Sequence, residues 1–110
     1  MLLVAIENSY TDIVELLIAS GADVNKTDNN SGQTPLLVAV HNDAKRIAAL
    51  LIANGADVDS EAEFSGFTPL MIAARKNHDM VVRVLVGEGA DINKTNRISG
   101  DTALHLAVMN

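Results

Sequence analysis

The sequence repeats itself every 34 residues, and this period constrains the fold more than any other feature. A Gly-Ala-Asp block begins at positions 21, 55 and 89, and a Gly-x-Thr block begins at positions 32, 66 and 100. An apolar block keeps the same step, at 13–18, 47–52 and 81–86. Three blocks in one phase predict a tandem-repeat protein, in which each unit buries its apolar face against the next.

Each repeat unit predicts two short helices followed by a polar loop. Thr34 and Thr68 suit the N-cap of a first helix, and the proline that follows each suits its first turn. Apolar residues then recur at helical spacing, and the glycine of each Gly-Ala-Asp block suits the end of the second helix. The polar stretch that leads to the next Gly-x-Thr predicts a protruding finger loop. The predicted first helices cover 35–42 and 69–77, and the predicted second helices cover 44–53 and 79–87.

These blocks, in this order, resemble the ankyrin repeat family over nearly the whole chain. The residues that carry the resemblance are Gly66-x-Thr68-Pro69-Leu70, Ala73-Ala74, Val81-Val82, Leu85 and Gly89-Ala90-Asp91-x-Asn93. The resemblance implies an all-α solenoid of antiparallel helix pairs with short β-hairpin finger loops, about three repeats long with incomplete ends. It also implies that the loop asparagines, Asn25 and Asn93, bond backbone groups. The period of 34 exceeds the family's usual length of about 33, which lengthens each finger.

The whole chain is predicted to be one domain, residues 1–110, since domains run from about 50 to 250 residues. Its units cover approximately 1–32, 33–66 and 67–100, with a partial unit at 101–110. Met1 aligns with Pro35, so the first unit lacks a finger, and Asn110 aligns with Asn42, so the last unit lacks its second helix. Terminal repeats normally carry a polar outer face. The open ends therefore indicate either a fragment of a longer array or a chain that covers its ends by self-association.

Composition narrows the classes of partner and compartment. The net charge is −6, with 14 acidic against 8 basic residues, which argues against nucleic-acid binding. The longest apolar run, Ile47–Ala53, falls far short of the roughly 20 residues that span a bilayer, so no membrane insertion is expected. The chain has no cysteine, and its first residues lack the basic region of a signal peptide. We expect an intracellular protein, cytoplasmic in the first place, with a nuclear location also compatible.

The repeat itself argues against an enzyme, because a residue found at one phase in every unit supports the scaffold. The serines at positions 31, 65 and 99 share one phase and therefore predict turns, and no partnered His-Asp set would activate them. His41, His78 and His105 stand at three different phases, so stacking does not align them as metal ligands. No carboxylate pair or phosphate-binding glycine loop is recognisable. The sequence predicts no catalytic residue, no metal site and no cofactor.

Residues that differ from unit to unit are the candidates for partner binding. The resemblance implies that finger tips and the ends of the first helices line a concave, partner-binding surface. The candidates there are Phe64, Phe67, Arg75, Lys76, Arg97, Ile98, His41 and Asn42. The two phenylalanines stand out because finger tips are usually polar and aromatic residues are enriched at binding hot spots. The alternative is that one of them packs under its finger.

Charge is also unevenly distributed, since acidic residues dominate the first half and basic residues follow. Arg75, Lys76, Lys94 and Arg97 are predicted to form a basic patch that suits an acidic peptide, with ordinary solvated charge as the alternative. The predicted function is a rigid protein–protein interaction module whose protein partner is unidentified. Two alternatives stay open: an assembly element that self-associates through its open ends, and the substrate-docking part of a longer enzyme.

Overall fold

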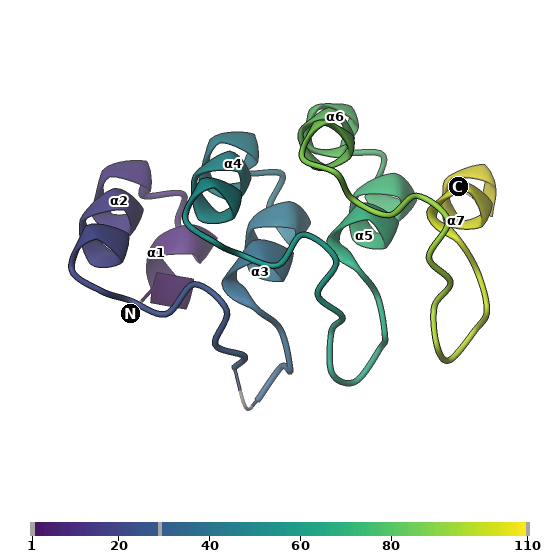
Figure 1. Cartoon of the computed structure of the whole chain (residues 1–110), viewed down its shortest axis with the longest axis horizontal. Coiled ribbons are helices and arrows are strands. Elements are labelled where there is room, and N and C mark those ends of the chain that lie inside the picture. Colours follow the sequence, from purple (N-terminus) through teal and green to yellow (C-terminus); the bar gives the residue numbers. More distant parts are fainter. Residues whose placement is uncertain (1, 29, 110) are drawn as a thin grey trace.

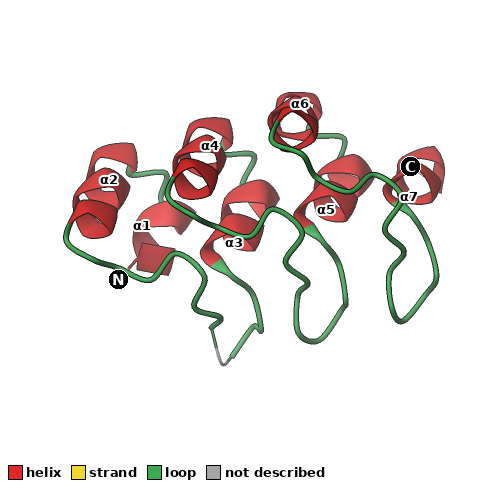
Figure 2. Cartoon of the chain, viewed as in Figure 1, coloured by secondary structure: helices red, strands yellow, loops and turns green. Residues whose placement is uncertain are grey.

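A computed structural model describes residues 2–28 and 30–109 of the chain (Figure 1). Met1, Asn29 and Asn110 lie outside the described residues. The predicted alignments of Met1 with Pro35 and of Asn110 with Asn42 therefore also fall outside the described residues. The described part forms seven α-helices and no strand (Figure 2). The helices are α1 (Leu2–Glu7), α2 (Thr11–Ala19), α3 (Pro35–His41), α4 (Lys45–Ala53), α5 (Pro69–Lys76), α6 (Asp79–Gly87) and α7 (Ala103–Met109).

The helices stack in two layers along one axis of the molecule (Figure 1). In the inner layer α1, α3, α5 and α7 pack in sequence, next to the finger loops, and in the outer layer α2, α4 and α6 do the same. Each outer helix also packs against the inner helix that precedes it in the chain. This arrangement confirms the predicted all-α repeat solenoid.

The predicted capping residues are present where the first helices of the units begin and where the second helices end. The hydroxyl oxygens of Thr34 and Thr68 accept the amide hydrogens of Leu37 and Met71, each at 3.3 Å. A proline occupies the first turn of both helices, where its missing N–H costs nothing. The glycines that follow the second helices have φ between +89° and +98°, the left-handed conformation that ends a helix.

The core is built from apolar side chains of both helix layers. Leu37 and Met71 are almost fully buried and pack in this core. His105 occupies the same phase in α7, where it is exposed and accepts the amide hydrogen of Thr102 at 3.1 Å. The second and third units therefore bury an apolar side chain at the phase where α7 has a hydrogen-bonded histidine.

Three finger loops project from the inner layer: finger 1 (described at 26–28 and 30–33), finger 2 (60–67) and finger 3 (94–101). Each finger is closed by two backbone hydrogen bonds, which in finger 2 run from Ala62 N–H to Phe67 O and from Gly66 N–H to Ala62 O. The equivalent bonds close 28–33 and 96–101. The fingers are therefore tight turns, and their described residues form no strands of a β-hairpin ladder.

Candidate partner-binding groove

The surface where each finger base meets the last turn of its inner helix continues along the stack from an open hollow at the α1 end, and we call this surface the groove. In the second unit, Gln33 Nε2 lies 3.3 Å from His41 Nε2. One repeat further on, the guanidinium carbon of Arg75 lies 5.4 Å from the centre of the Phe67 ring. The two pairs occupy the same repeat phases, so one scaffold presents a polar pair and then a cation–aromatic pair.

The two phenylalanines of finger 2 lie in different environments. Phe67 is half-buried and packs against the core, with Arg75 above its ring. Phe64 is 62% exposed, and its ring lies against Gly32 of finger 1. The predicted alternative, that one phenylalanine packs under the finger, therefore describes Phe67, while Phe64 stays accessible to a partner.

The ends of the inner helices supply the charged wall of the groove. Arg75 and Lys76 are both exposed at the end of α5, and Lys76 Nζ donates to the carbonyl oxygen of His41 at 3.4 Å. His41 is half-buried, and burial together with the positive charges of Lys76, His78 and Arg75 lowers the pKa of its imidazole. Asn42 is exposed, but its amide donates to Val38 O at 3.0 Å within its own helix.

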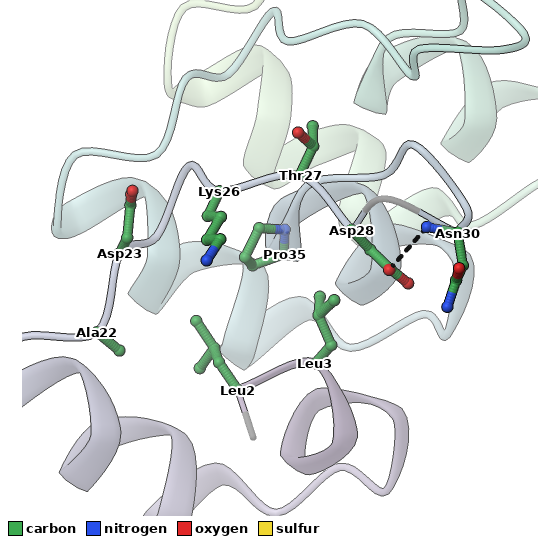
Figure 3. Close-up of a pocket in the computed structure, with 9 residues that line it drawn as sticks. All are labelled: Leu2, Leu3, Ala22, Asp23, Lys26, Thr27, Asp28, Asn30 and Pro35. Atoms are coloured by element: carbon green, nitrogen blue, oxygen red, sulfur yellow. Dashed lines mark hydrogen bonds between the residues drawn. The ribbon is translucent and has the colours of Figure 1, made fainter.

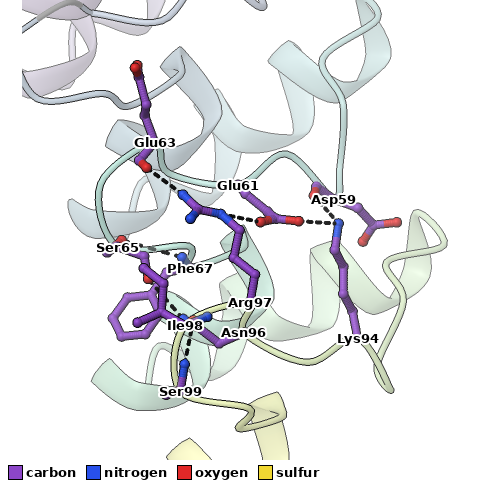
Figure 4. A network of polar contacts seen from close by, with 10 residues as sticks. All are labelled: Asp59, Glu61, Glu63, Ser65, Phe67, Lys94, Asn96, Arg97, Ile98 and Ser99. Carbon is purple, nitrogen blue, oxygen red and sulfur yellow. Dashed lines mark hydrogen bonds and ion pairs between the residues drawn. The ribbon is translucent and has the colours of Figure 1, made fainter.

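The predicted basic patch is divided into two groups. Lys94 Nζ and Arg97 Nε bind the two carboxylate oxygens of Glu61 at 3.0 and 3.1 Å, across fingers 2 and 3 (Figure 4). The hydrogen bond from Lys94, followed by the charges of both cations, lowers the pKa of the Glu61 carboxyl. Arg97 also donates to the carbonyl oxygen of Glu63. Only Arg75 and Lys76 of the four are therefore left for a partner in the groove.

Asn96 orders the tip of finger 3 (Figure 4). Its side chain is 2% exposed, donates to Ser65 O at 3.0 Å, and accepts the amide hydrogens of Ile98 and Ser99 at 2.7 and 3.1 Å. Ile98, at the same repeat phase as Phe64, is thereby held with 62% of its surface exposed. Fingers 2 and 3 each present one apolar side chain at their tips.

Glu61 and Asn96 were not among the candidates identified from the sequence. A signal for Glu61 was present, since Lys94 and Arg97 follow it by 33 and 36 residues, close to one repeat. Asn96 carried no such signal, because its phase holds Asp28 in finger 1 and Ala62 in finger 2. Its role depends on which carbonyl oxygen of the neighbouring finger faces it.

The groove continues towards α1 as an open hollow of about 410 Å³. Glu7, at the end of α1, Asp28 of finger 1 and His41 line it together with Ser31, Gln33, Val38 and Asn42. A second hollow of about 510 Å³ lies between finger 1 and the start of α1, beside Leu2, Leu3 and Lys26 (Figure 3). There Asp28 Oδ1 accepts the amide hydrogen of Asn30, so this carboxylate holds its own finger in shape.

The comparisons with known proteins agree with this architecture. A family model described as ankyrin repeats (three copies) matches residues 2–96 and 66–110. The chain belongs to the ankyrin repeat family. Ankyrin repeats generally act as non-catalytic protein-interaction modules. No curated protein sequence gives a significant match to this ankyrin repeat chain.

The polar residues of these ankyrin repeats serve the scaffold wherever they recur. Ser31 Oγ donates to Asp28, and Ser65 Oγ and Ser99 Oγ accept the amide hydrogens of residues 67 and 101, as predicted for turns. His78 Nδ1, in the connection between α5 and α6, lies 3.8 Å from Asp43 Oδ1, in the connection between α3 and α4. Among residues 2–28 and 30–109, no cluster of three His, Asp or Glu side chains has the geometry of a metal site. In the same ranges, none of the helices has the length and apolar character needed to cross a bilayer.

Proposed function

We propose that this ankyrin repeat chain is a non-catalytic binding module that holds a segment of a partner protein in the groove. The observation that carries the proposal is the site formed by Phe67, Arg75 and Lys76. It combines an aromatic ring, a guanidinium above it and an adjacent ammonium on one rigid surface. Aromatic residues and arginine are the side chains most enriched at binding hot spots.

The pattern of variation supports the same surface. The positions that recur in every unit are occupied by caps, turns and core, as with Thr34 and Thr68. The groove position between the recurrent glycine and threonine instead holds Gln33, Phe67 and then Asp101. A scaffold that is constant beneath a variable surface is suited to recognition of a specific partner.

The finger tips provide a second part of the same surface. Phe64 and Ile98 are exposed at one phase of adjacent fingers, and the links from Arg97 and Asn96 fix finger 3 against finger 2. A surface that is already ordered binds with less loss of conformational entropy. We include Phe64, Ile98 and Arg97 in the proposed interface, with Arg97 holding the tips in place.

Affinity capture from a lysate tests the proposal with a matched pair of variants. The groove variant carries Phe64→Ala, Arg75→Glu and Lys76→Glu. The control carries Met80→Ala, Lys45→Glu and Arg83→Glu, the same kinds of change at exposed positions of the outer helices. Circular dichroism first establishes that both variants fold.

A protein retained by the wild type and the control, and lost by the groove variant, is the expected result. Equal retention by all three forms would contradict a binding site in the groove. We also propose an intracellular setting for this interaction, in keeping with a chain that has no cysteine.

A second candidate function, self-association, is favoured by the apolar side chains at the two ends of the stack. Ile13 is 47% exposed, whereas Ile47, its equivalent one unit on, is 1% exposed. At the other end Leu104 is 72% exposed and its equivalent Leu36 is fully buried. Light scattering tests this candidate. The mass of the wild type should rise with concentration, whereas a variant carrying Ile13→Lys and Leu104→Lys should keep the mass of a monomer. A monomeric mass of the wild type at every concentration would contradict it.

A further inference from the structure

The charges that line the groove are separated along its length. At the α1 end, Glu7 and Asp28 border the hollow that also contains His41. Two inner helices further on, Arg75 and Lys76 are exposed, and no carboxylate of the described residues lies within 4.0 Å of either. In a chain of net charge −6, this end of the groove is locally positive.

The positive stretch has defined limits. It reaches the middle of the groove, where Lys76 contacts the backbone of His41 and its charge helps to lower the pKa of the imidazole. On the far side, Asp101 occupies the groove position of finger 3, so the positive stretch ends there. The groove therefore offers a negative end, a weakly charged middle at Gln33 and His41, and a positive stretch at Arg75 and Lys76.

The distance between the charged ends sets the length of a matching ligand. The inner helices α1, α3 and α5 are consecutive neighbours. Packed helices lie about 8–10 Å apart, so Glu7 and Arg75 are separated by roughly 16–20 Å. An extended chain advances about 3.3–3.6 Å per residue, and about five or six residues cover this distance.

We propose that the groove selects an extended segment of a partner protein whose charges are separated in the same way. Acidic residues of the segment lie against Arg75 and Lys76, and basic residues about five or six positions away lie against Glu7. This inference rests on the proposed function and specifies the chemistry of its partner. Electrostatic complementarity of this kind fixes register and rejects wrong partners.

Salt screening allows the two ends of the groove to act independently. At physiological ionic strength the Debye length is about 8 Å, roughly half the distance between the ends. A uniformly acidic segment would gain at Arg75 and Lys76 but meet like charge at Glu7. A uniformly basic segment would gain at Glu7 but meet like charge at Arg75 and Lys76. Only separated charges match both ends.

The repeat supplies an unusually conservative test, because the charged pairs stand at equivalent phases. Glu7-Asn8, where α1 ends, corresponds to Arg75-Lys76, where α5 ends. One variant carries Glu7→Arg and Asn8→Lys, a second carries Arg75→Glu and Lys76→Asn, and a third carries all four changes. Every dipeptide introduced already occurs at that phase of this protein, so the scaffold should tolerate it.

Four fluorescent peptides serve as probes for these proteins. The first has a lysine pair and a glutamate pair separated by about five neutral residues. The second has the same composition with alternating charges, and the third and fourth carry only lysines or only glutamates at the charged positions. Binding is measured by fluorescence polarisation at low and physiological salt.

The wild type should bind the separated-charge peptide roughly tenfold or more tightly than the other three. The first variant should prefer the glutamate peptide and the second the lysine peptide. The third should again prefer the separated-charge peptide, which fits by reversing its direction. Equal binding of the separated and alternating peptides, no detectable binding of the separated-charge peptide, or preferences unchanged by the exchanges would overturn the inference.

The two proposals fail in distinguishable ways. If a partner is lost from the groove variant in the capture experiment but the peptides show no charge preference, the groove binds its partner by other chemistry. This outcome overturns the separated-charge inference and leaves the proposed function standing. If the peptide preferences follow the charge exchanges but no partner depends on the groove, the selectivity stands and the proposed function fails.

Discussion

The two junctions between neighbouring fingers occupy equivalent places in the repeat but are held by different kinds of contact. Fingers 1 and 2 are joined through the backbone, since Glu63 N–H donates to Gly32 O at 2.8 Å and the Phe64 ring covers that glycine. Fingers 2 and 3 are joined through side chains, by the amide of Asn96 and by the ion pairs of Glu61. A repeat shape is therefore not tied to one set of contacts, and adjacent junctions can respond differently to salt and substitution.

Loop residues behind the fingers repeat this contrast. Asn25 donates to Gly55 O at 3.0 Å and accepts the amide hydrogen of Asp57 at 2.9 Å, as predicted for a loop asparagine that bonds the backbone. One unit later Asp59 accepts the amide hydrogen of Asp91 at 2.9 Å. An ionised carboxylate has no hydrogen to donate, so Asp59 makes only the accepting half of the pair.

The largest expected change in stability comes from a substitution that disrupts the backbone junction between fingers 1 and 2. A Cβ atom added at Gly32 would lie 2.7 Å from Glu63 Cβ and 3.0 Å from the Phe64 ring, at a φ of +66°. We expect Gly32→Ala to lower the free energy of unfolding by about 3 kcal/mol, from left-handed strain and overpacking together. Urea denaturation checks this. Gly66→Ala should cost less, because its closest neighbour at 3.0 Å is the side-chain oxygen of Asn96; a larger cost at Gly66 would contradict the comparison.

The next largest change is expected from a substitution that removes the buried amide of Asn96 from the junction between fingers 2 and 3. Asn96→Ala removes an acceptor from two amide hydrogens and a donor from Ser65 O, so we expect a loss of about 2 kcal/mol in the free energy of unfolding. Thermal and urea denaturation measure it. Asn25→Ala, which removes two exposed bonds, should cost about 1 kcal/mol. A milder effect at Asn96 than at Asn25 would show that the buried amide does not hold finger 3.

A smaller, salt-dependent effect should appear at Glu61. Partly exposed ion pairs contribute about 0–1 kcal/mol each, so Glu61→Gln should cost about 1 kcal/mol at low salt and almost nothing at about 1 M salt. The folded pKa of Glu61 is depressed below its ordinary value of 4.5. Its stabilisation is therefore fully present above that pH and is lost as the pH falls through the folded pKa.

Glu63→Gln serves as the matched control in the same finger, because the Glu63 carboxylate has no ion pair within 4.0 Å among the described residues. Denaturation of both variants across salt concentration and pH separates the two carboxylates. The same salt dependence in Glu61→Gln and Glu63→Gln would show that the ion pairs do not join fingers 2 and 3.

The smallest expected effect is a gain in stability. Asp59→Asn supplies the donor that Asn25 uses one unit earlier, and its amide should reach Gly89 O. We expect the free energy of unfolding to rise by about 0.5–1 kcal/mol, the net value of one hydrogen bond. Urea denaturation measures the change. The change Asn25→Asp should show the opposite sign, and a stabilising result there would contradict the argument.

The fold was accessible from the sequence because its signals are local. The predicted first helix over 35–42 is observed as Pro35–His41, and the predicted second helix over 44–53 as Lys45–Ala53. Caps, prolines and apolar spacing act within a few residues of the structure they determine. The finger strands that the resemblance implied are not formed by the described residues, where each finger closes with two hydrogen bonds.

The surface chemistry was less accessible because it depends on distant neighbours. Phe64 and Phe67 stand three positions apart in one loop, and only the course of the turn decides which one packs against the core. Lys94 and Arg97 looked equivalent to Arg75 and Lys76 in a count of charges, yet Glu61 of the preceding finger engages only the first pair. The eight candidate residues remain predictions until a partner is tested against them.

The reach of the contacts between units has a consequence for how the chain acquires its structure. The side-chain hydrogen bonds that join one unit to the next connect residues 30 to 36 positions apart. Loop-closure entropy grows only with the logarithm of loop length, so every junction forms at nearly the same entropic cost. Folding can therefore nucleate at any adjacent pair of units and propagate outwards. Lengthening such an array adds steps without making any step slower, because the mean sequence separation of contacts stays fixed while the chain grows.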